Sequence, residues 1–153
     1  MYSVIILCAG KGTRTGLDYN KMLYEFNGKT VYEMTLENFI HDSKCGQIIV
    51  VTQPFERKLF ERLSKDSRIE FADGGQERQD SVYEGLKKTK GDYVLIHDGA
   101  RPFVKRKHID ALLECLKVHS ACLLMVPCKD TIKKVVNGKV VETLKRSELM
   151  QAQ

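Results

Sequence analysis

Residues 3–16 read SVIILCAGKGTRTG, an apolar, β-branched run that passes directly into a loop with three glycines and two basic residues. A run of this kind is typical of a strand buried on both faces of a parallel sheet. Glycines that follow such a strand let backbone N–H groups approach phosphate oxygens closely. The stretch therefore predicts an α/β fold with a phosphate-binding loop after its first strand, although an ordinary surface turn is an alternative.

The chain continues as an alternation of strand and helix patterns. Apolar, β-branched runs predict further strands at 47–52, 68–72, 92–98 and 121–127. Amphipathic spacing predicts helices at 30–40, 55–65, 81–89 and 108–119, the third beginning at Asp80 or Ser81. Such alternation implies crossover connections, and hence a mostly parallel sheet with helices on both faces. We expect a single domain over residues 1–153.

A β-hairpin is predicted near the end of the chain. Residues 130–146 read DTIKKVVNGKVVETLKR, and Asn137-Gly138 between two β-branched runs is a strong hairpin signal. Because the hairpin follows the completed α/β repeat, we expect a projecting arm at about 128–147. An exposed apolar arm needs a partner surface, which favours a homodimer. A hairpin folded back on its own sheet is the alternative.

Composition narrows the class of protein. The 153 residues are 42% hydrophobic and 29% charged, as in a globular domain. The net charge of +5 is scattered, so neither nucleic acid nor a membrane is an expected partner. The cysteines form no C-x-x-C pair, which argues against a zinc site and a disulfide framework. We expect most of them to pack as small apolar side chains in a cytoplasmic protein. They are Cys8, Cys45, Cys115, Cys122 and Cys128.

The glycine loop fits neither common phosphate-loop pattern. A Walker loop would need a glycine five residues after Gly10, where Thr15 stands. The dinucleotide fingerprint G-x-G-x-x-G begins with Gly10 and Gly12 but also meets Thr15. The second strand ends at Thr52, where an acid that binds ribose is expected. What remains is a glycine loop followed by Arg14 and Lys21, two cations that could neutralise a phosphoryl group under attack.

Polar stretches follow two other predicted strands. DGGQERQDS at 73–81 combines two glycines with polar groups, and HDGARPF at 97–103 places Asp98 at a strand end. A lone carboxylate in this position suits Mg²⁺, which binds one or two carboxylates together with substrate phosphates. The alternative for Asp98 is a turn cap. KDT at 129–131 and Arg146 lie at the two feet of the hairpin.

Six motifs occur in order: LCAGKGTR, NK at 20–21, GGQERQDSV, HDGARPFV, PCKDTIK and TLKRSEL. Together they resemble the 2-C-methyl-D-erythritol 4-phosphate cytidylyltransferase family of the non-mevalonate isoprenoid pathway, over residues 4–153. The resemblance implies a Rossmann-like nucleotidyltransferase fold. It also implies a homodimer in which each hairpin arm reaches the partner's active site, and a chain that continues past Gln153 with a second metal-supporting aspartate. The sequence is therefore expected to be a truncated form.

The resemblance implies a role for each matching residue. Cys8, Ala9, Gly10 and Gly12 would surround the triphosphate of CTP, while Arg14 and Lys21 would stabilise the transition state. Gly75 and Ser81 would hold the cytosine, Asp98 would bind Mg²⁺, and Arg101 would lie near the acceptor. Thr131 and Arg146 would bind the phosphate of methylerythritol phosphate. Asn20 and Gly99 depart from the family pattern, which has proline and alanine there, and Cys8 stands where a small residue is usual.

The implied reaction is an in-line attack. A phosphate oxygen of the acceptor displaces pyrophosphate from the α-phosphorus of CTP, and positioning and charge neutralisation supply most of the rate. Two alternatives stay open. The sister family that cytidylylates ribitol 5-phosphate shares the glycine loop, the strand-end aspartate and the arm. An inactive fragment that binds CTP and self-associates through the arm is the other.

Overall fold

The computed structural model describes residues 1–10 and 19–153. The chain divides into two compact units, Met1–Arg106 and Lys107–Gln153. Each unit is described by itself below.

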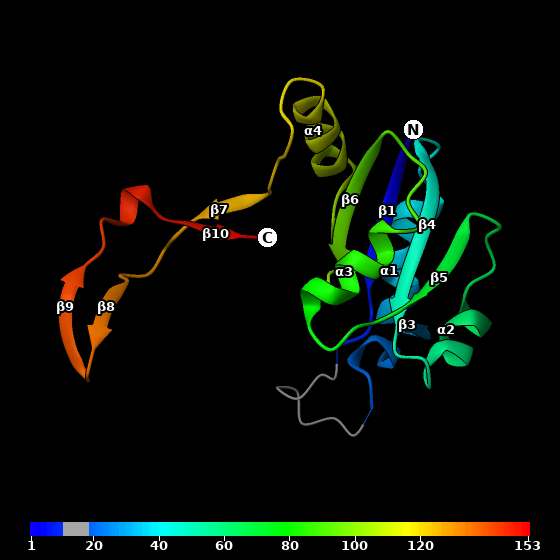
Figure 1. Ribbon diagram of the computed structural model, residues 1–153, viewed down its shortest axis with the longest axis horizontal. Helices are drawn as coiled ribbons and strands as arrows, with labels where there is room; N and C mark the ends of the chain where they lie inside the picture. Colours follow the sequence, from blue (N-terminus) through cyan, green and yellow to red (C-terminus); the bar gives the residue numbers. More distant parts are fainter. Residues whose placement is uncertain (11–18) are drawn as a thin grey trace. The chain divides into compact units, whose positions relative to one another are not determined.

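The first unit is built on a parallel sheet of four strands. β1 (Tyr2–Leu7), β4 (Cys45–Thr52), β5 (Ile69–Asp73) and β6 (Tyr93–Asp98) lie in the order β5-β4-β1-β6 (Figure 1). Every neighbouring pair is parallel, as the alternating pattern predicts. The central strands β1 and β4 are mostly apolar because both of their faces are covered, and Val4, Ile5 and Ile49 are fully buried. The predicted α/β class is confirmed.

Helices cover both faces of this sheet. α3 (Arg78–Leu86) lies close to one face of the sheet. A Cβ on its Gly85 would lie only 2.7 Å from Cγ2 of Ile5, so glycine at this position is what lets the helix approach β1. α1 (Val31–Ile40) lies on the opposite face, where its Phe39 ring is 5.2 Å from the ring of His97 on β6. α2 (Arg57–Leu63) packs beside α1, with Phe60 against Tyr32.

Local capping explains where these helices begin. Thr30 and Glu33 form a reciprocal capping box, so α1 begins at Val31. Asp80 accepts a hydrogen bond from the backbone N–H of Glu77, so α3 begins at Arg78. The predicted start at Asp80 or Ser81 is therefore two or three residues too late, because the capping residue, Glu77, lies three positions before the aspartate.

A short antiparallel ribbon precedes α1 and was absent from the prediction. β2 (Glu25–Phe26) pairs with β3 (Lys29–Thr30) after a 3-10 turn, η1 (Lys21–Leu23). Asn27 and Gly28 connect the two strands with φ values of 51° and 77°, the left-handed conformations that a tight hairpin turn requires.

The second unit contains α4 and two antiparallel ribbons. α4 (Arg106–Leu116) begins at the last residue of the first unit. β8 (Lys133–Val136) and β9 (Lys139–Thr143) form the predicted hairpin, with Asn137 and Gly138 at φ values of 49° and 74°. Every residue of both strands is exposed. The 3-10 turn η2 (Arg146–Glu148) follows the hairpin.

The strand predicted at 121–127 is confirmed only in its last three residues, and its expected place in the parallel sheet is wrong. Only β7 (Met125–Pro127) is a strand, its residues are exposed, and it pairs antiparallel with β10 (Met150–Ala152) instead of joining the parallel sheet. A short apolar run does not specify its partner strand. Here the partner is supplied by residues that lie more than twenty positions later, beyond the hairpin.

The argument against disulfides is wrong for one pair of cysteines. Cys115 and Cys122 form a disulfide, since the turn after α4 brings their Cα atoms to 6.5 Å. Cys8, Cys45 and Cys128 are free and buried, as expected. Of the helices in the described residues, none has the length and apolar character needed to cross a bilayer.

Candidate active site

A cavity of about 540 Å³ lies where the parallel strands of the first unit end. Ligands of open α/β sheets bind at this edge. Its walls comprise residues 7–10, 21, 22, 53, 75–78, 81 and 98–101. Eight of the predicted site residues are therefore brought together: Cys8, Ala9, Gly10, Lys21, Gly75, Ser81, Asp98 and Arg101. Gly12 and Arg14 lie outside the described residues.

The beginning of the glycine loop is held by side-chain amides. Gln53 donates to the carbonyl of Ala9 at 2.8 Å, and Asn20 donates to the carbonyl of Cys8 at 2.8 Å. Burial raises the pKa of the Cys8 thiol far above its usual range, and the negative charge of Glu56 raises it further. The thiol is therefore protonated at neutral pH and does not act as a nucleophile.

Lys21 reaches the cavity from the 3-10 turn η1. Asn20 precedes this turn, and its side chain accepts a hydrogen bond from the N–H of Met22 at 3.1 Å. Within the described part of the chain, the Lys21 side chain forms no ion pair or hydrogen bond. A cation in this position is suited to a bound anion.

Another wall of the cavity is formed by the tight turn before α3, which contains Gly74 and Gly75. A Cβ on Gly75 would lie 2.2 Å from Cβ of Asp80, and one on Gly74 would lie 2.4 Å from Cβ of Ala9. The buried Ser81 hydroxyl accepts from the N–H of Gly75 and donates to the carbonyl of Glu77, both at 3.2 Å. Ser81 thus fixes the shape of this wall, whichever ligand group it contacts.

Asp98 places a carboxylate at the end of β6, between two arginines. Arg78 contacts Oδ1 at 2.9 Å and Arg101 contacts Oδ2 at 3.2 Å. Burial raises the pKa of Asp98, but the hydrogen bond from Arg78 and the positive charges of the two arginines outweigh it, and the net shift is downward. The carboxylate is therefore ionised at neutral pH.

Asp98 could bind Mg²⁺ only together with ligands that a substrate supplies. Among the described residues, no cluster of three or more His, Cys, Asp or Glu side chains could hold a metal ion. A single carboxylate is sufficient when substrate phosphates provide further ligands. The Asp98 side chain is 37% exposed, so a metal ion that arrives with a substrate can reach it.

The loop after β6 is anchored to α1. Thr35 donates to the carbonyl of Gly99 at 2.6 Å, and Asn38 donates to the carbonyl of Pro102 at 2.8 Å. The ring of His97 forms a hydrogen bond with the carbonyl of Arg101 at 3.0 Å. Burial lowers the pKa of His97, so its neutral form is favoured. These contacts orient the segment that carries Asp98 and Arg101.

Thr131 and Arg146 belong to the second unit. Arg146 donates to the carbonyl of Lys129 at 3.2 Å, and the N–H of Leu144 donates to the carbonyl of Ile132 at 3.0 Å. The two feet of the hairpin are therefore tied together, with Thr131 on one foot and Arg146 on the other.

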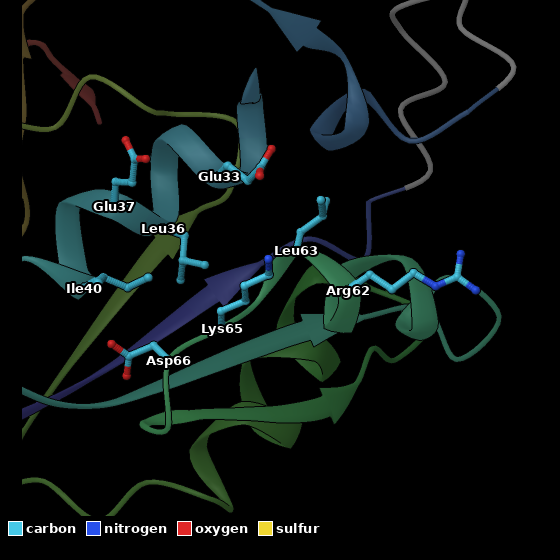
Figure 2. Close-up of a pocket in the computed structure, with 8 residues that line it drawn as sticks. All are labelled: Glu33, Leu36, Glu37, Ile40, Arg62, Leu63, Lys65 and Asp66. Atoms are coloured by element: carbon cyan, nitrogen blue, oxygen red, sulfur yellow. The ribbon is translucent and has the colours of Figure 1, made fainter. Parts of the chain in front are cut away.

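A second cavity, of about 420 Å³, contains none of the predicted site residues. Figure 2 shows that α1 supplies half of its lining and that the segment from the end of α2 towards β5 supplies the rest. Carboxylates and cations are mixed along its walls. Its lining residues are Glu33, Leu36, Glu37, Ile40, Arg62, Leu63, Lys65 and Asp66.

Sequence reasoning assigned no site role to Gln53, Glu56 or Arg78. Gln53 follows directly after β4, and a polar residue in that position is a usable signal. Arg78 stands behind the double glycine and begins α3, but its contact with Asp98 joins residues twenty positions apart. No local pattern indicates Glu56, whose contact with Asn20 spans thirty-six positions.

Comparisons with known proteins identify the family of the chain. The family model described as 2-C-methyl-D-erythritol 4-phosphate cytidylyltransferase matches residues 2–153. The enzyme of that name from Bacillus mycoides is 44% identical over 158 residues, which cover 100% of this chain and 70% of the relative. The relative from Geobacillus thermodenitrificans is also 44% identical, with 69% of its length covered.

Solved structures of similar proteins share the fold. The 4-diphosphocytidyl-2C-methyl-D-erythritol synthase of Anaerococcus prevotii superposes with a TM-score of 0.84 at 27% identity, covering 99% of this chain and 66% of that one. The 2-C-methyl-D-erythritol 4-phosphate cytidylyltransferase of Francisella tularensis has a TM-score of 0.79 at 32% identity, with 99% and 69% covered. With a cavity at the strand ends and matches along nearly its whole length, the chain belongs to the 2-C-methyl-D-erythritol 4-phosphate cytidylyltransferase family.

Proposed function

We propose that the protein transfers the cytidylyl group of CTP to 2-C-methyl-D-erythritol 4-phosphate. A phosphate oxygen of the acceptor forms a bond to the α-phosphorus of CTP, and the bond from that phosphorus to the bridging oxygen breaks. The products are 4-diphosphocytidyl-2-C-methyl-D-erythritol and pyrophosphate. The observation that carries this proposal is the cavity whose walls include Lys21 together with Asp98, a carboxylate held by Arg78 and Arg101.

Direct transfer agrees with the chemistry of these side chains. Burial keeps the thiol of Cys8 protonated, so it is a poor nucleophile and is not expected to form a covalent intermediate. Lys21 and Arg101 would stabilise charge on the triphosphate and the acceptor. Cys8, Ala9 and Gly10 would face the triphosphate, while Gly75 and Ser81 would face the cytosine. In this scheme Asp98 would hold Mg²⁺, which when bound neutralises phosphate charge.

The acceptor site is proposed to be completed by a second copy of the chain. Thr131 and Arg146 lie on the exposed hairpin arm, and we place them against the acceptor phosphate of the partner subunit. The exposed valines of β8 and β9 support such an assembly. We place the reaction in the cytoplasm, where the Cys115–Cys122 bond would be exposed to reducing thiols.

The test is pyrophosphate release from CTP and Mg²⁺ with each acceptor in turn. We expect release with 2-C-methyl-D-erythritol 4-phosphate and none with ribitol 5-phosphate. Release with ribitol 5-phosphate alone would assign the protein to the sister activity. CTP binding without release with either acceptor would show that the described chain binds the nucleotide but does not catalyse transfer.

Lys21→Ala should lower the rate of transfer by ~10²-fold or more, because one cation that stabilises the transition state is lost. The matched control is Lys29→Ala, since Lys29 is an exposed lysine that pairs with Glu37 outside the cavity. Initial rates of pyrophosphate release for both variants measure the effect. Equal rates in the two variants would remove Lys21 from the mechanism.

A further inference from the structure

Asn20 is a buried amide whose hydrogen-bonding groups are fully engaged. Only 4% of the surface of Asn20 is exposed to solvent. Nδ2 donates to the carbonyl of Cys8 at 2.8 Å and to Oε2 of Glu56 at 2.9 Å, while Oδ1 accepts from the N–H of Met22 at 3.1 Å. Three segments distant in the sequence therefore meet at one side chain.

Each of these segments adjoins the candidate active site. Cys8 follows directly after β1, where the glycine loop begins, and Met22 belongs to the turn that carries Lys21. Glu56 is the residue before α2, and its carboxylate lies behind the cavity wall instead of in it. We propose that Asn20, anchored by Glu56, is a positioning residue that holds Lys21 in place relative to the phosphate-binding loop.

The chemistry of the amide explains why neither aspartate nor alanine would reproduce these contacts. Asparagine offers two N–H donors and an acceptor on one short side chain. Aspartate could accept from Met22 but could not donate to Cys8, and it would face the carboxylate of Glu56. Alanine would leave the carbonyl of Cys8 and the carboxylate of Glu56 without their partner, which costs free energy when such groups are buried.

Gln47 provides a matched control. It is also buried, its amide donates to the carboxylate of Glu70 at 2.9 Å and to the carbonyl of Lys88 at 2.8 Å, and its Oε1 accepts from the N–H of Lys90 at 3.0 Å. These contacts lie near the amino end of β4, whereas the cavity lies beyond its carboxyl end. Gln47→Ala should therefore destabilise the fold without moving Lys21.

The inference rests on the proposed function for its kinetic test. Asn20→Ala should lower kcat roughly tenfold, because a misplaced cation stabilises the transition state poorly. Gln47→Ala should keep its kcat. In a Lys21→Ala background, Asn20→Ala should cause no further loss, since the side chain that it positions is gone. Losses that multiply to roughly 10³-fold would overturn the proposal.

Two measurements do not depend on turnover. Hydrogen exchange at the amides of Met22, Leu23 and Tyr24 should accelerate in Asn20→Ala and not in Gln47→Ala; unchanged exchange would overturn the proposal. The Asn20–Lys21 cycle can also be measured on CTP affinity by calorimetry without an acceptor. If the wild-type protein releases no pyrophosphate, the proposed function fails, while these two results still decide the role of Asn20.

A rescue experiment separates positioning from packing. Asn20→Asp should impair the turn because its carboxylate would face Glu56. Adding Glu56→Gln should restore most of the exchange protection and CTP affinity, since the new amide can donate to the aspartate. Failure of the second substitution to restore either would show that the Asn20–Glu56 hydrogen bond does not anchor the turn.

Discussion

At the residue scale, Gly99 and Cys8 share one small space. A Cβ on Gly99 would lie 2.7 Å from Sγ of Cys8 and 2.9 Å from Sδ of Met22. Gly99→Ala should therefore lower the free energy of unfolding by about 1–3 kcal/mol. In a Cys8→Ala background the closest contact disappears, and the cost should fall by about 1 kcal/mol. Urea unfolding of the four variants measures this coupling.

Gly10→Ala is the control for this cycle. Among residues 1–10 and 19–153, no atom lies within 4 Å of a Cβ built on Gly10, so its substitution should leave the unfolding midpoint nearly unchanged. If Gly99→Ala were as mild as Gly10→Ala, the space around Cys8 would be looser than these contacts require. Cys8 is larger than the residue usual at its position in the family, and its sulfur leaves no room for the alanine usual at position 99, so glycine stands there.

At the scale of elements, Arg68 joins the end of α1 to the start of β4. It donates to the carbonyl of Ile40 at 2.6 Å and to that of Cys45 at 2.9 Å, and Asp66 holds it in place. The hydrogen bonds from Arg68 lower the pKa of Asp66 to about 2. Because the folded pKa is depressed, this stabilisation is complete above about pH 4 and is lost as the pH falls towards 2.

Asp66→Asn should therefore destabilise the protein by about 1 kcal/mol at pH 7, after allowance for solvent screening. The difference from wild type should shrink as the pH falls from 4 to 2. Urea unfolding at several pH values measures it. Asp92→Asn, which removes an exposed pair with the amino terminus, should have almost no effect at any of these values. A constant deficit for Asp66→Asn would contradict the linkage.

At the scale of the whole molecule, the proposed dimer depends on the arm. Val135 and Val140 oppose each other across the hairpin and are 54% and 60% exposed. Replacing both with aspartate should raise the dimer dissociation constant at least tenfold, because two charges would have to be buried in an apolar contact. Sedimentation over a range of concentrations measures this. Val118→Asp alters an exposed valine outside the hairpin and should leave the dimer intact; a wild-type monomer would end the proposal.

Local sequence patterns were sufficient to predict the strands with continuous apolar runs and the hairpin with an Asn-Gly turn. The apolar run at 3–9 became β1, the run at 47–52 became the core of β4, and Asn137-Gly138 forms the predicted turn. The site was predictable in outline because every parallel strand ends at one edge of its sheet. Lys21, in the turn after the glycine loop, and Asp98, at the end of its strand, could therefore be assigned to one site from the sequence alone.

The sequence by itself determined the fold class, the family and the edge of the sheet at which the cavity lies, because strand periodicity, turn residues and ordered motifs are local properties. Only the tertiary structure decided that β7 pairs with β10, that Arg78 pairs with Asp98, and that Asn20 joins Cys8 to Glu56. Each of these contacts joins residues twelve or more positions apart. Which distant groups meet depends on how the elements pack, and no local pattern contains that information.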